Sequence, residues 1–279
     1  MPVEVLPPAS AHEVRAPVGP SRRHARTGFA AIVALLVVIA ATSVVVFRVV
    51  RGSRTASRPA IAVSVITAQL APSIVSVTTS PSTGGGWGSG MIISASGDVL
   101  TSYHIIAGAK WVDVVSKGPG NSTIQESADV LGYDPVHDVA VLRVPIWDGD
   151  EPIVAGDPST LHVGDPVVAL GHTQDTSDTS PIVSVGFVAG LASHATLHDG
   201  HTFDLNGLIT PDAATIAGES GGPIADGAGR VVGMIAGHGS QHQLFSDELW
   251  TFVVPINTAL AIANDIMHGR ASPTIHLGM

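Results

Sequence analysis

A single serine stands among glycines in the segment Gly218–Pro223, which reads Gly-Glu-Ser-Gly-Gly-Pro. Glycines let backbone N–H groups approach a substrate carbonyl closely, so this setting favours Ser220 as a nucleophile with an oxyanion hole beside it. A serine hydroxyl reacts poorly at neutral pH unless an imidazole takes its proton and a carboxylate holds that imidazole. The segment therefore predicts a histidine and a carboxylate elsewhere in the chain, and the fold must bring all three together.

The candidate histidine is His104. Residues 90–94 and 99–104 read as the two strands of a β-hairpin, joined by a Ser-Gly-Asp turn at 96–98. The second strand would deliver the imidazole at its end.

The candidate carboxylate is Asp138, which directly precedes the run Val139–Val144, apolar except for Arg143. Such a run predicts a buried strand, so the carboxylate would lie at the mouth of that strand. Asp134 is a rival four residues earlier, but the strand that follows at once favours Asp138.

The order along the chain is His104, Asp138, Ser220, as in the chymotrypsin-type double β-barrel and unlike subtilisin or the α/β-hydrolases. Many short segments bounded by turns, with 31 glycines in 279 residues, also indicate an all-β architecture. We therefore expect a chymotrypsin-like pair of six-stranded antiparallel β-barrels. The uncharged stretch Gly28–Phe47 adds one expected transmembrane helix before them.

Residues from about 63 to 268 resemble the trypsin-like protease domain of the HtrA serine proteases. Four blocks carry the resemblance: Gly88–Ile93 leading to His104, the strand after Asp138, Thr210–Ala214 leading to Ser220, and Thr251–Ile256.

The resemblance implies a role for each candidate. His104 is the general base, Asp138 orients it, Ser220 is the nucleophile, and the N–H groups of Gly218 and Ser220 form the oxyanion hole. A strand that includes Thr251, Phe252 and Val253 would pair with the substrate backbone. Two positions depart from the family pattern without removing a triad member: Glu219 replaces the usual Asn, and Ser102-Tyr103 replaces a pair that contains Asn.

The floor of the primary specificity pocket lies several residues before the nucleophile in this fold. Here that stretch is Ala213–Ala217, and Ala214 and Thr215 are the candidate substrate-binding residues. The stretch carries no charge that could pair with Lys or Arg, so small or medium apolar side chains should fit best.

No metal or cofactor is expected. The chain has no cysteine, which excludes disulfides and thiol chemistry. A zinc site at His194, His198 and His201 is the alternative, but no ligand-spacing motif accompanies these histidines.

Charge is divided unevenly along the chain. Before residue 59 there are eight arginines and two acids, whereas the rest has five Lys or Arg against 21 Asp or Glu, a net charge of −16. Such a surface repels phosphate backbones, so nucleic acid is not an expected partner.

Residues Gly28–Phe47 form an uncharged stretch of twenty residues. A helix of that length spans roughly 30 Å of hydrocarbon. A cleaved signal peptide is the alternative, with Ala60-Ile61-Ala62 as its cleavage signal, but arginines follow the apolar stretch directly and the candidate site lies well downstream. We expect a retained anchor.

Four arginines precede the apolar stretch and four follow it before residue 59, so the charge rule gives no orientation. We expect a single-pass protein of the cell membrane with a cytoplasmic N-terminus and an extracytoplasmic protease domain, because the leader is Pro-rich and because proteases of the resembled family usually work outside the inner membrane. Because 59 residues follow Ser220 and the barrel needs most of them, we expect no PDZ domain after it.

The expected organisation has five parts. They are a disordered leader (1–27), a transmembrane helix (28–50), a linker (51–62), a protease domain (63–270) with barrels at about 72–160 and 161–255 followed by a C-terminal helix, and a tail (271–279).

The leading functional hypothesis is a membrane-anchored serine endopeptidase that cleaves extracytoplasmic polypeptides, with protein quality control as one role and homo-oligomerisation left open. The alternative is a catalytically silent protease fold that serves as a binding or sensing module.

Overall fold

The computed structural model describes residues 62–80, 86–118, 122–145, 150–173, 175, 180–198, 202–213, 215–240, 249–270 and 274–278. The predicted leader, the predicted membrane helix and all but the last residue of the predicted linker lie outside these residues. None of the helices within these ranges has both the length and the apolar character needed to cross a membrane.

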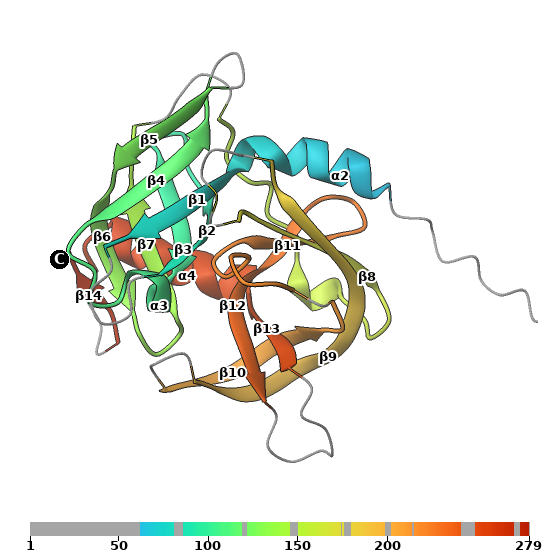
Figure 1. Ribbon diagram of the computed structural model, residues 1–279. Coiled ribbons are helices and arrows are strands. Elements are labelled where there is room, and N and C mark those ends of the chain that lie inside the picture. The colour runs from blue at the N-terminus through green and yellow to red at the C-terminus, as the bar shows by residue number, and fades with distance from the viewer. Residues whose placement is uncertain are drawn as a thin grey trace, which may run out of the picture. The chain divides into compact units, whose positions relative to one another are not determined.

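The N-terminal half of the domain is an antiparallel sheet with the order β14-β6-β7-β3-β2-β1-β4-β5 (Figure 1). Its strands are β1 (Ile74–Thr79), β2 (Trp87–Ile92), β3 (Asp98–Ser102), β4 (Val112–Lys117), β5 (Thr123–Ser127), β6 (Asp129–Asp134), β7 (Val139–Arg143) and β14 (His276–Leu277).

This sheet differs from the six-stranded barrel that the sequence predicts. Only Ala128 separates β5 from β6, and its N–H donates to the Val112 carbonyl at 2.8 Å. The chain bends at this residue, so β5 pairs with β4 while β6 pairs with β7. β5 and β6 are thus separate strands of the sheet, and β14 forms its edge beside β6.

The C-terminal half is a closed six-stranded barrel with the order β10-β13-β12-β11-β8-β9, as predicted. Its strands are β8 (Pro166–Gly171), β9 (Ile182–His198), β10 (Thr202–Pro211), β11 (Pro223–Asp226), β12 (Val231–Ser240) and β13 (Leu249–Pro255).

Three apolar cores hold the domain together, one in each half and a third between the halves. Side chains alternate along a strand, so each face of β7 meets a different core. Val139 and Val141 pack into the shared core, while Ala140 and Leu142 pack inside the first half. Burial on both faces explains why β7 is apolar from Val139 to Leu142.

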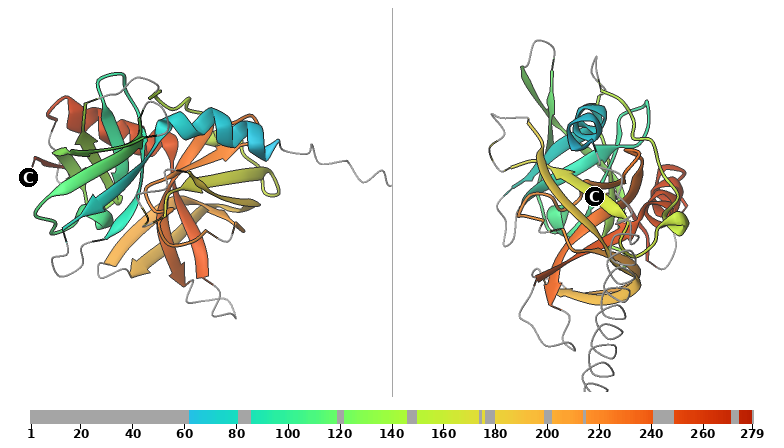
Figure 2. Two further views of the ribbon diagram at one scale, coloured as in Figure 1. Left: turned by 45° about the horizontal axis from the view of Figure 1, so that its top comes forward. Right: turned by 90° about the vertical axis from the view of Figure 1, so that its right-hand side faces the viewer.

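Two helices complete the shared core. The helix α2 (Val63–Leu70) contributes Ile66 and Leu70, before the short 3₁₀ turn η1 (Ala71–Ser73) leads into β1. The helix α4 (Ile256–Met267) begins after Pro255 and packs on β6 and β7 as well as on β12 and β13 (Figure 2). The sequence predicts a C-terminal helix after the second barrel. This helix lies against both halves because its buried face belongs to the core between them.

The C-terminal residues return to the first half of the domain. Strand β14 pairs with β6, and the His276 ring stacks on Tyr133 at 5.2 Å between ring centroids. Tyr133 in turn stacks on Tyr103 at 4.8 Å, beside the candidate histidine. The segment that the sequence treats as a simple tail therefore adds an edge strand to the sheet and contacts the stacked rings next to the site.

Replacing Phe252 by Ala should lower the free energy of unfolding by about 3–5 kcal/mol, because this fully buried ring fills the shared core. Val163→Ala is the control, since that side chain is 66% exposed and its loss should cost less than about 0.5 kcal/mol. Denaturant unfolding of both variants measures the difference. Equal stabilities would contradict the assignment of Phe252 to the core.

Candidate functional site

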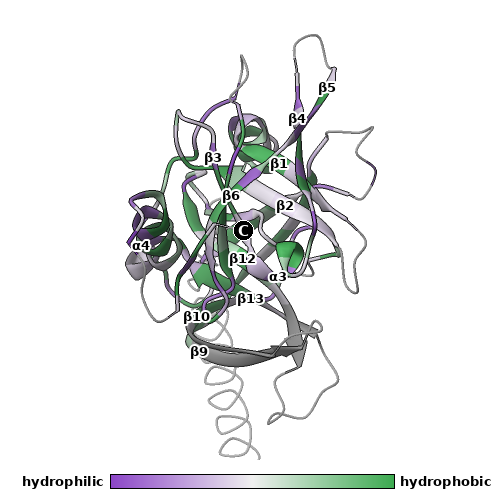
Figure 3. Ribbon diagram, turned by 90° about the vertical axis from the view of Figure 1, so that its left-hand side faces the viewer, coloured by the Kyte–Doolittle hydropathy of each residue, from purple (hydrophilic) through white to green (hydrophobic). Residues whose placement is uncertain are grey.

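His104 lies in the single-turn helix α3 (Tyr103–Ile106), directly after β3. The helix is drawn largely in green in Figure 3, since two of its four residues are isoleucines that pack inside the first half. The apolar contacts of Ile105 and Ile106 thus fix the helix, and the His104 imidazole is not part of this core.

The Asp138 carboxylate binds His104 at two points. One oxygen lies 2.9 Å from Nδ1 of the imidazole, and the other accepts the backbone N–H of His104 at 2.8 Å. Because Nδ1 faces a carboxylate, the neutral ring carries its proton there and leaves Nε2 free of a proton, as a general base requires. The carboxylate is fully buried, so water does not compete for these bonds.

Asp138 adopts a left-handed backbone conformation, with φ of 55°. This region is uncommon for residues other than glycine, although Asp and Asn tolerate it best. The Asp138 carbonyl accepts the N–H of Tyr103 at 3.2 Å, so backbone and side chain both hold the start of α3.

Asp134 has a different task. Its carboxylate accepts the N–H groups of Val136 and His137 and lies 2.8 Å from Nδ1 of His137, within the turn that precedes Asp138. The rival carboxylate therefore shapes the turn and does not contact His104 in any bond found among the described residues.

The glycines beside Ser220 are required by close contacts inside the protein. Gly218 has φ of +102°, and a Cβ there would lie 2.0 Å from the Trp87 ring. Gly221 has φ of +80°, and a Cβ there would lie 2.1 Å from the Ser89 carbonyl oxygen. The loop of the second half thus presses against β2 of the first half, where a larger residue has no room.

Ser220 and His104 face the same space in front of Gly237. A Cβ built on Gly237 would lie 4.0 Å from Oγ of Ser220 and 4.0 Å from Cε1 of His104. The serine comes from the loop before β11 and the histidine from the end of β3. The structure therefore brings the three predicted residues together from both halves of the domain.

Glu219 points into the protein and is fully buried. Its Oε2 accepts the N–H of Ile216 at 2.7 Å, and its own N–H donates to the Ile216 carbonyl at 3.1 Å. The carboxylate that replaces the family's usual Asn therefore braces the loop before the nucleophile.

Ser89 has contacts that the sequence did not predict. It is fully buried on β2, its hydroxyl donates to the Gly218 carbonyl at 2.6 Å, and its N–H donates to the Ser220 carbonyl at 2.8 Å. The sequence shows only a serine between two glycines of a strand, which carries no signal for a partner about 130 residues away.

The predicted substrate-binding residues fall into three groups. Ala214 lies outside the described residues. The hydroxyl of Thr215 lies 2.6 Å from the hydroxyl of Thr251, and both residues are buried beside the loop. Phe252 and Val253 pack their side chains into the shared core and the core of the second half, respectively.

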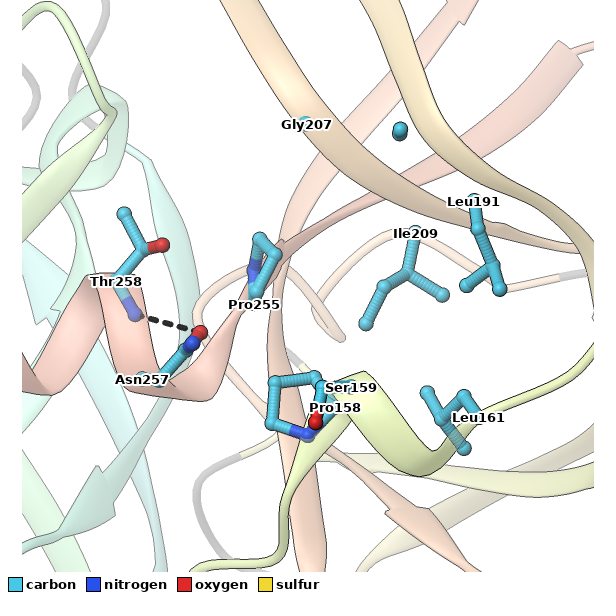
Figure 4. Close-up of a pocket in the computed structure, with 10 residues that line it drawn as sticks. Pro158, Ser159, Leu161, Leu191, Gly207, Ile209, Pro255, Asn257 and Thr258 are labelled. Carbon is cyan, nitrogen blue, oxygen red and sulfur yellow. Dashed lines mark hydrogen bonds between the residues drawn. The ribbon is translucent and has the colours of Figure 1, made fainter.

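A separate pocket of about 320 Å³ lies beside the second barrel, among the 3₁₀ turn η3 (Pro158–Thr160), β9, β10 and the start of α4 (Figure 4). Leu161, Leu191 and Ile209 give it apolar walls, and none of the predicted site residues lines it. Within the described ranges, no group of three or more His, Cys, Asp or Glu side chains could hold a metal ion. The side chains of His194, His198 and His201 are not among those that the structure describes.

Residues 88–234 match the family described as the trypsin-like peptidase domain. The putative serine protease HhoA of a Synechocystis strain is 31% identical over 196 residues, which cover 70% of this chain and 46% of the relative. The serine protease PepD of Mycobacterium tuberculosis is 30% identical over 232 residues, covering 78% of this chain and 49% of PepD. The chain thus spans about half the length of these curated relatives.

Solved structures give the same fold. The crystal structure of Deg5 has a TM-score of 0.58 at 25% identity, covering 75% of this chain and 96% of Deg5. The HtrA-type protease AlgW with a tripeptide has a TM-score of 0.60 at 25% identity, covering 75% of this chain and 64% of AlgW.

The ion pair in the turn before Asp138 predicts a pH-dependent stability. The hydrogen bond to Asp134 raises the pKa of His137 above its ordinary 6.5, although burial opposes the shift. Burial raises the pKa of Asp134, but hydrogen bonds, first among them the one from His137, outweigh burial and leave the pKa below its ordinary 3.8. The protonated imidazole therefore stabilises the turn below pH 6.5, and this stabilisation is lost as the pH rises through the raised pKa.

His137→Ala should accordingly be destabilised most between the two ordinary pKa values and progressively less above pH 6.5. The effect should be modest, because the imidazole side chain is 43% exposed and solvent screens the pair. Thermal unfolding across pH measures the difference, with His162→Ala as the control because that side chain is 82% exposed. A deficit in His137→Ala that grows with pH would contradict the assignment.

Proposed function

We propose that this chain, which belongs to the trypsin-like peptidases of the HtrA type, is a serine endopeptidase that hydrolyses peptide bonds through Ser220, His104 and Asp138. The observation that carries the proposal is the position of His104. Its Nδ1 lies 2.9 Å from the buried Asp138 carboxylate, while its Cε1 faces the same point in front of Gly237 as the Ser220 hydroxyl.

Each group has one task in the proposed reaction. Nε2 of His104 takes the proton of the Ser220 hydroxyl as Oγ attacks the substrate carbonyl carbon. Asp138 keeps the imidazole in the correct tautomer and stabilises the imidazolium that forms. The imidazolium then gives the proton to the leaving amine, and water releases the acyl group from Ser220 by the same steps in reverse order.

The oxyanion that develops on the substrate carbonyl is proposed to bind the N–H groups of Gly218 and Ser220. The N–H of Glu219, which lies between them, is occupied by the Ile216 carbonyl. The N–H of Glu219 is therefore used within the loop, and the N–H groups of Gly218 and Ser220 on either side of it are the proposed donors to the substrate.

Substrate selection is proposed to depend on the buried threonines beside the loop. The hydroxyls of Thr215 and Thr251 are hydrogen-bonded to each other, and Thr251 also donates to the Ala213 carbonyl at 3.1 Å. No charged group belongs to this pair, so small or medium apolar side chains are the proposed preference. The proposed contact with substrate backbone is the strand that includes Thr251, Phe252 and Val253. The side chains of Phe252 and Val253 lie in the cores, so only their backbone groups are proposed for that contact.

Polypeptides outside the cytoplasm are the proposed substrates, with residues 28–50 as a membrane anchor and the N-terminus in the cytoplasm. The AlgW structure with a tripeptide supports a peptide ligand for this fold. The uncharged stretch Gly28–Phe47 supports the anchor, since it matches the hydrocarbon thickness of a bilayer. Homo-oligomerisation is part of the proposal.

Replacing Ser220 by Ala should lower kcat by about 10⁴-fold or more, and His104→Ala should cost a similar factor, because triad members act as a unit. The double variant should lose little beyond either single one. Asp138→Asn should lower kcat by about 10⁴-fold, whereas Asp134→Asn should leave kcat within a few-fold of the wild type, because its carboxylate serves the turn.

Steady-state hydrolysis of a peptide substrate by the purified variants measures these factors. Unchanged hydrolysis by Ser220→Ala would contradict the nucleophile and favour the silent protease fold. A large loss in Asp134→Asn with none in Asp138→Asn would exchange the roles of the two carboxylates.

The proposed anchor predicts that full-length protein stays in the membrane fraction after a carbonate or high-salt wash, because burial of about twenty apolar residues is effectively irreversible. A chain that begins at residue 59 should be soluble. Recovery of the native protein from the medium, with a new N-terminus between residues 41 and 63, would instead establish a cleaved signal peptide.

A further inference from the structure

Ser89 joins the two halves of the domain at the loop that carries the nucleophile. Its hydroxyl donates to the Gly218 carbonyl at 2.6 Å and accepts the N–H of His172 at 2.8 Å. Its N–H donates to the Ser220 carbonyl at 2.8 Å, and its carbonyl accepts the Thr101 hydroxyl at 2.7 Å. All of these bonds are shielded from water, since Ser89 is fully buried.

The direction of the Gly218 N–H depends on which of two forms a turn adopts. Residues 216–219 form a turn that the Glu219 N–H closes onto the Ile216 carbonyl, and the third residue, Gly218, has φ of +102°. A positive φ at the third position belongs to a type II turn, whereas a type I turn has a negative φ there. The two types differ by a flip of the central peptide, and here that peptide carries the Gly218 N–H.

The peptide between Glu219 and Ser220 is also held by a hydrogen bond. The Gly222 N–H donates to the Glu219 carbonyl at 2.8 Å. In a trans peptide the N–H points opposite to the C=O, so this bond turns the Ser220 N–H to the other side. Ser89 therefore donates hydrogen bonds to the carbonyls of Gly218 and Ser220, which lie on either side of the peptide that presents the Ser220 N–H.

We propose that the Ser89 hydroxyl is a positioning residue of the oxyanion hole: it holds the peptide of the Gly218 carbonyl, which lies between the two peptides that present the N–H groups of Gly218 and Ser220. This inference rests on the proposed peptidase function and adds a residue from the first half of the domain to the machinery. Without the hydroxyl, the Gly218 carbonyl loses a buried donor, and the peptides on either side of it are held less firmly.

The test compares Ser89→Ala with Ser76→Ala in the full chain. Ser76 is directly opposite Ser89 on the neighbouring strand β1 and is 3% exposed, and its hydroxyl has no hydrogen-bond partner among the described residues. Both variants remove one buried hydroxyl from the same sheet. Only Ser89→Ala releases the loop.

Ser89→Ala should lower kcat for peptide hydrolysis by about 10- to 100-fold with KM within about two-fold, because an oxyanion donor acts in the transition state and its complete removal costs about 10²–10³. Ser76→Ala should keep the wild-type kcat. Ser89→Cys, which retains a weak donor, should fall between them and replaces the alanine variant if that one does not fold. Equal kcat values for Ser89→Ala and Ser76→Ala would overturn the proposal.

Amide hydrogen exchange across residues 216–222 gives a second readout that needs no turnover. Exchange should be faster in Ser89→Ala than in Ser76→Ala, and unchanged exchange would overturn the role of Ser89. An inactive wild type would contradict the peptidase function, and in that case the exchange comparison still decides whether Ser89 holds the loop.

Discussion

The apolar core between the two halves is the constraint on which the site depends. Strands β7 and β8 are buried on both faces, with Val141 and Leu170 turned into the shared core and Leu142 and Ala169 turned into the cores of their own halves. Neither half could leave this surface in water without losing a large part of its stabilisation. Their association places the loop before β11 against β2 and β3, and so brings the candidate nucleophile to the candidate base.

Buried polar bonds convert that packing into a defined geometry. A buried polar group is costly unless it is hydrogen-bonded, so each such group has few positions available to it. The Asp138 carboxylate is hydrogen-bonded to both the backbone N–H and the imidazole of His104, and Oε2 of Glu219 accepts the Ile216 N–H. Across the interface, the Ser102 hydroxyl donates to the Ile235 carbonyl at 3.1 Å, which ties β3 to β12. Apolar packing brings the halves together, and these bonds set the angles at which the reactive groups meet.

Sequence patterns predicted the elements whose burial can be read from one segment of the chain. The apolar residues after Asp138 and the predicted C-terminal helix correspond to β7 and α4, because the sequence of each element reflects which of its faces are buried. The break at Ala128 and the return of β14 were not predicted, since they depend on how the sheet curves. The bonds of Ser89 were not predicted either. A buried hydroxyl acquires its partner only when the second half docks, and no spacing along the chain encodes that contact.

Labelling of the wild-type protein with a fluorophosphonate, followed by mapping of the adduct by mass spectrometry, tests the central claim most directly. A serine activated by a paired imidazole should react once per chain, and the adduct should lie on Ser220. Folded protein that takes up no label, or that carries it on a serine other than Ser220, would contradict the assembly of His104, Asp138 and Ser220 into one working site.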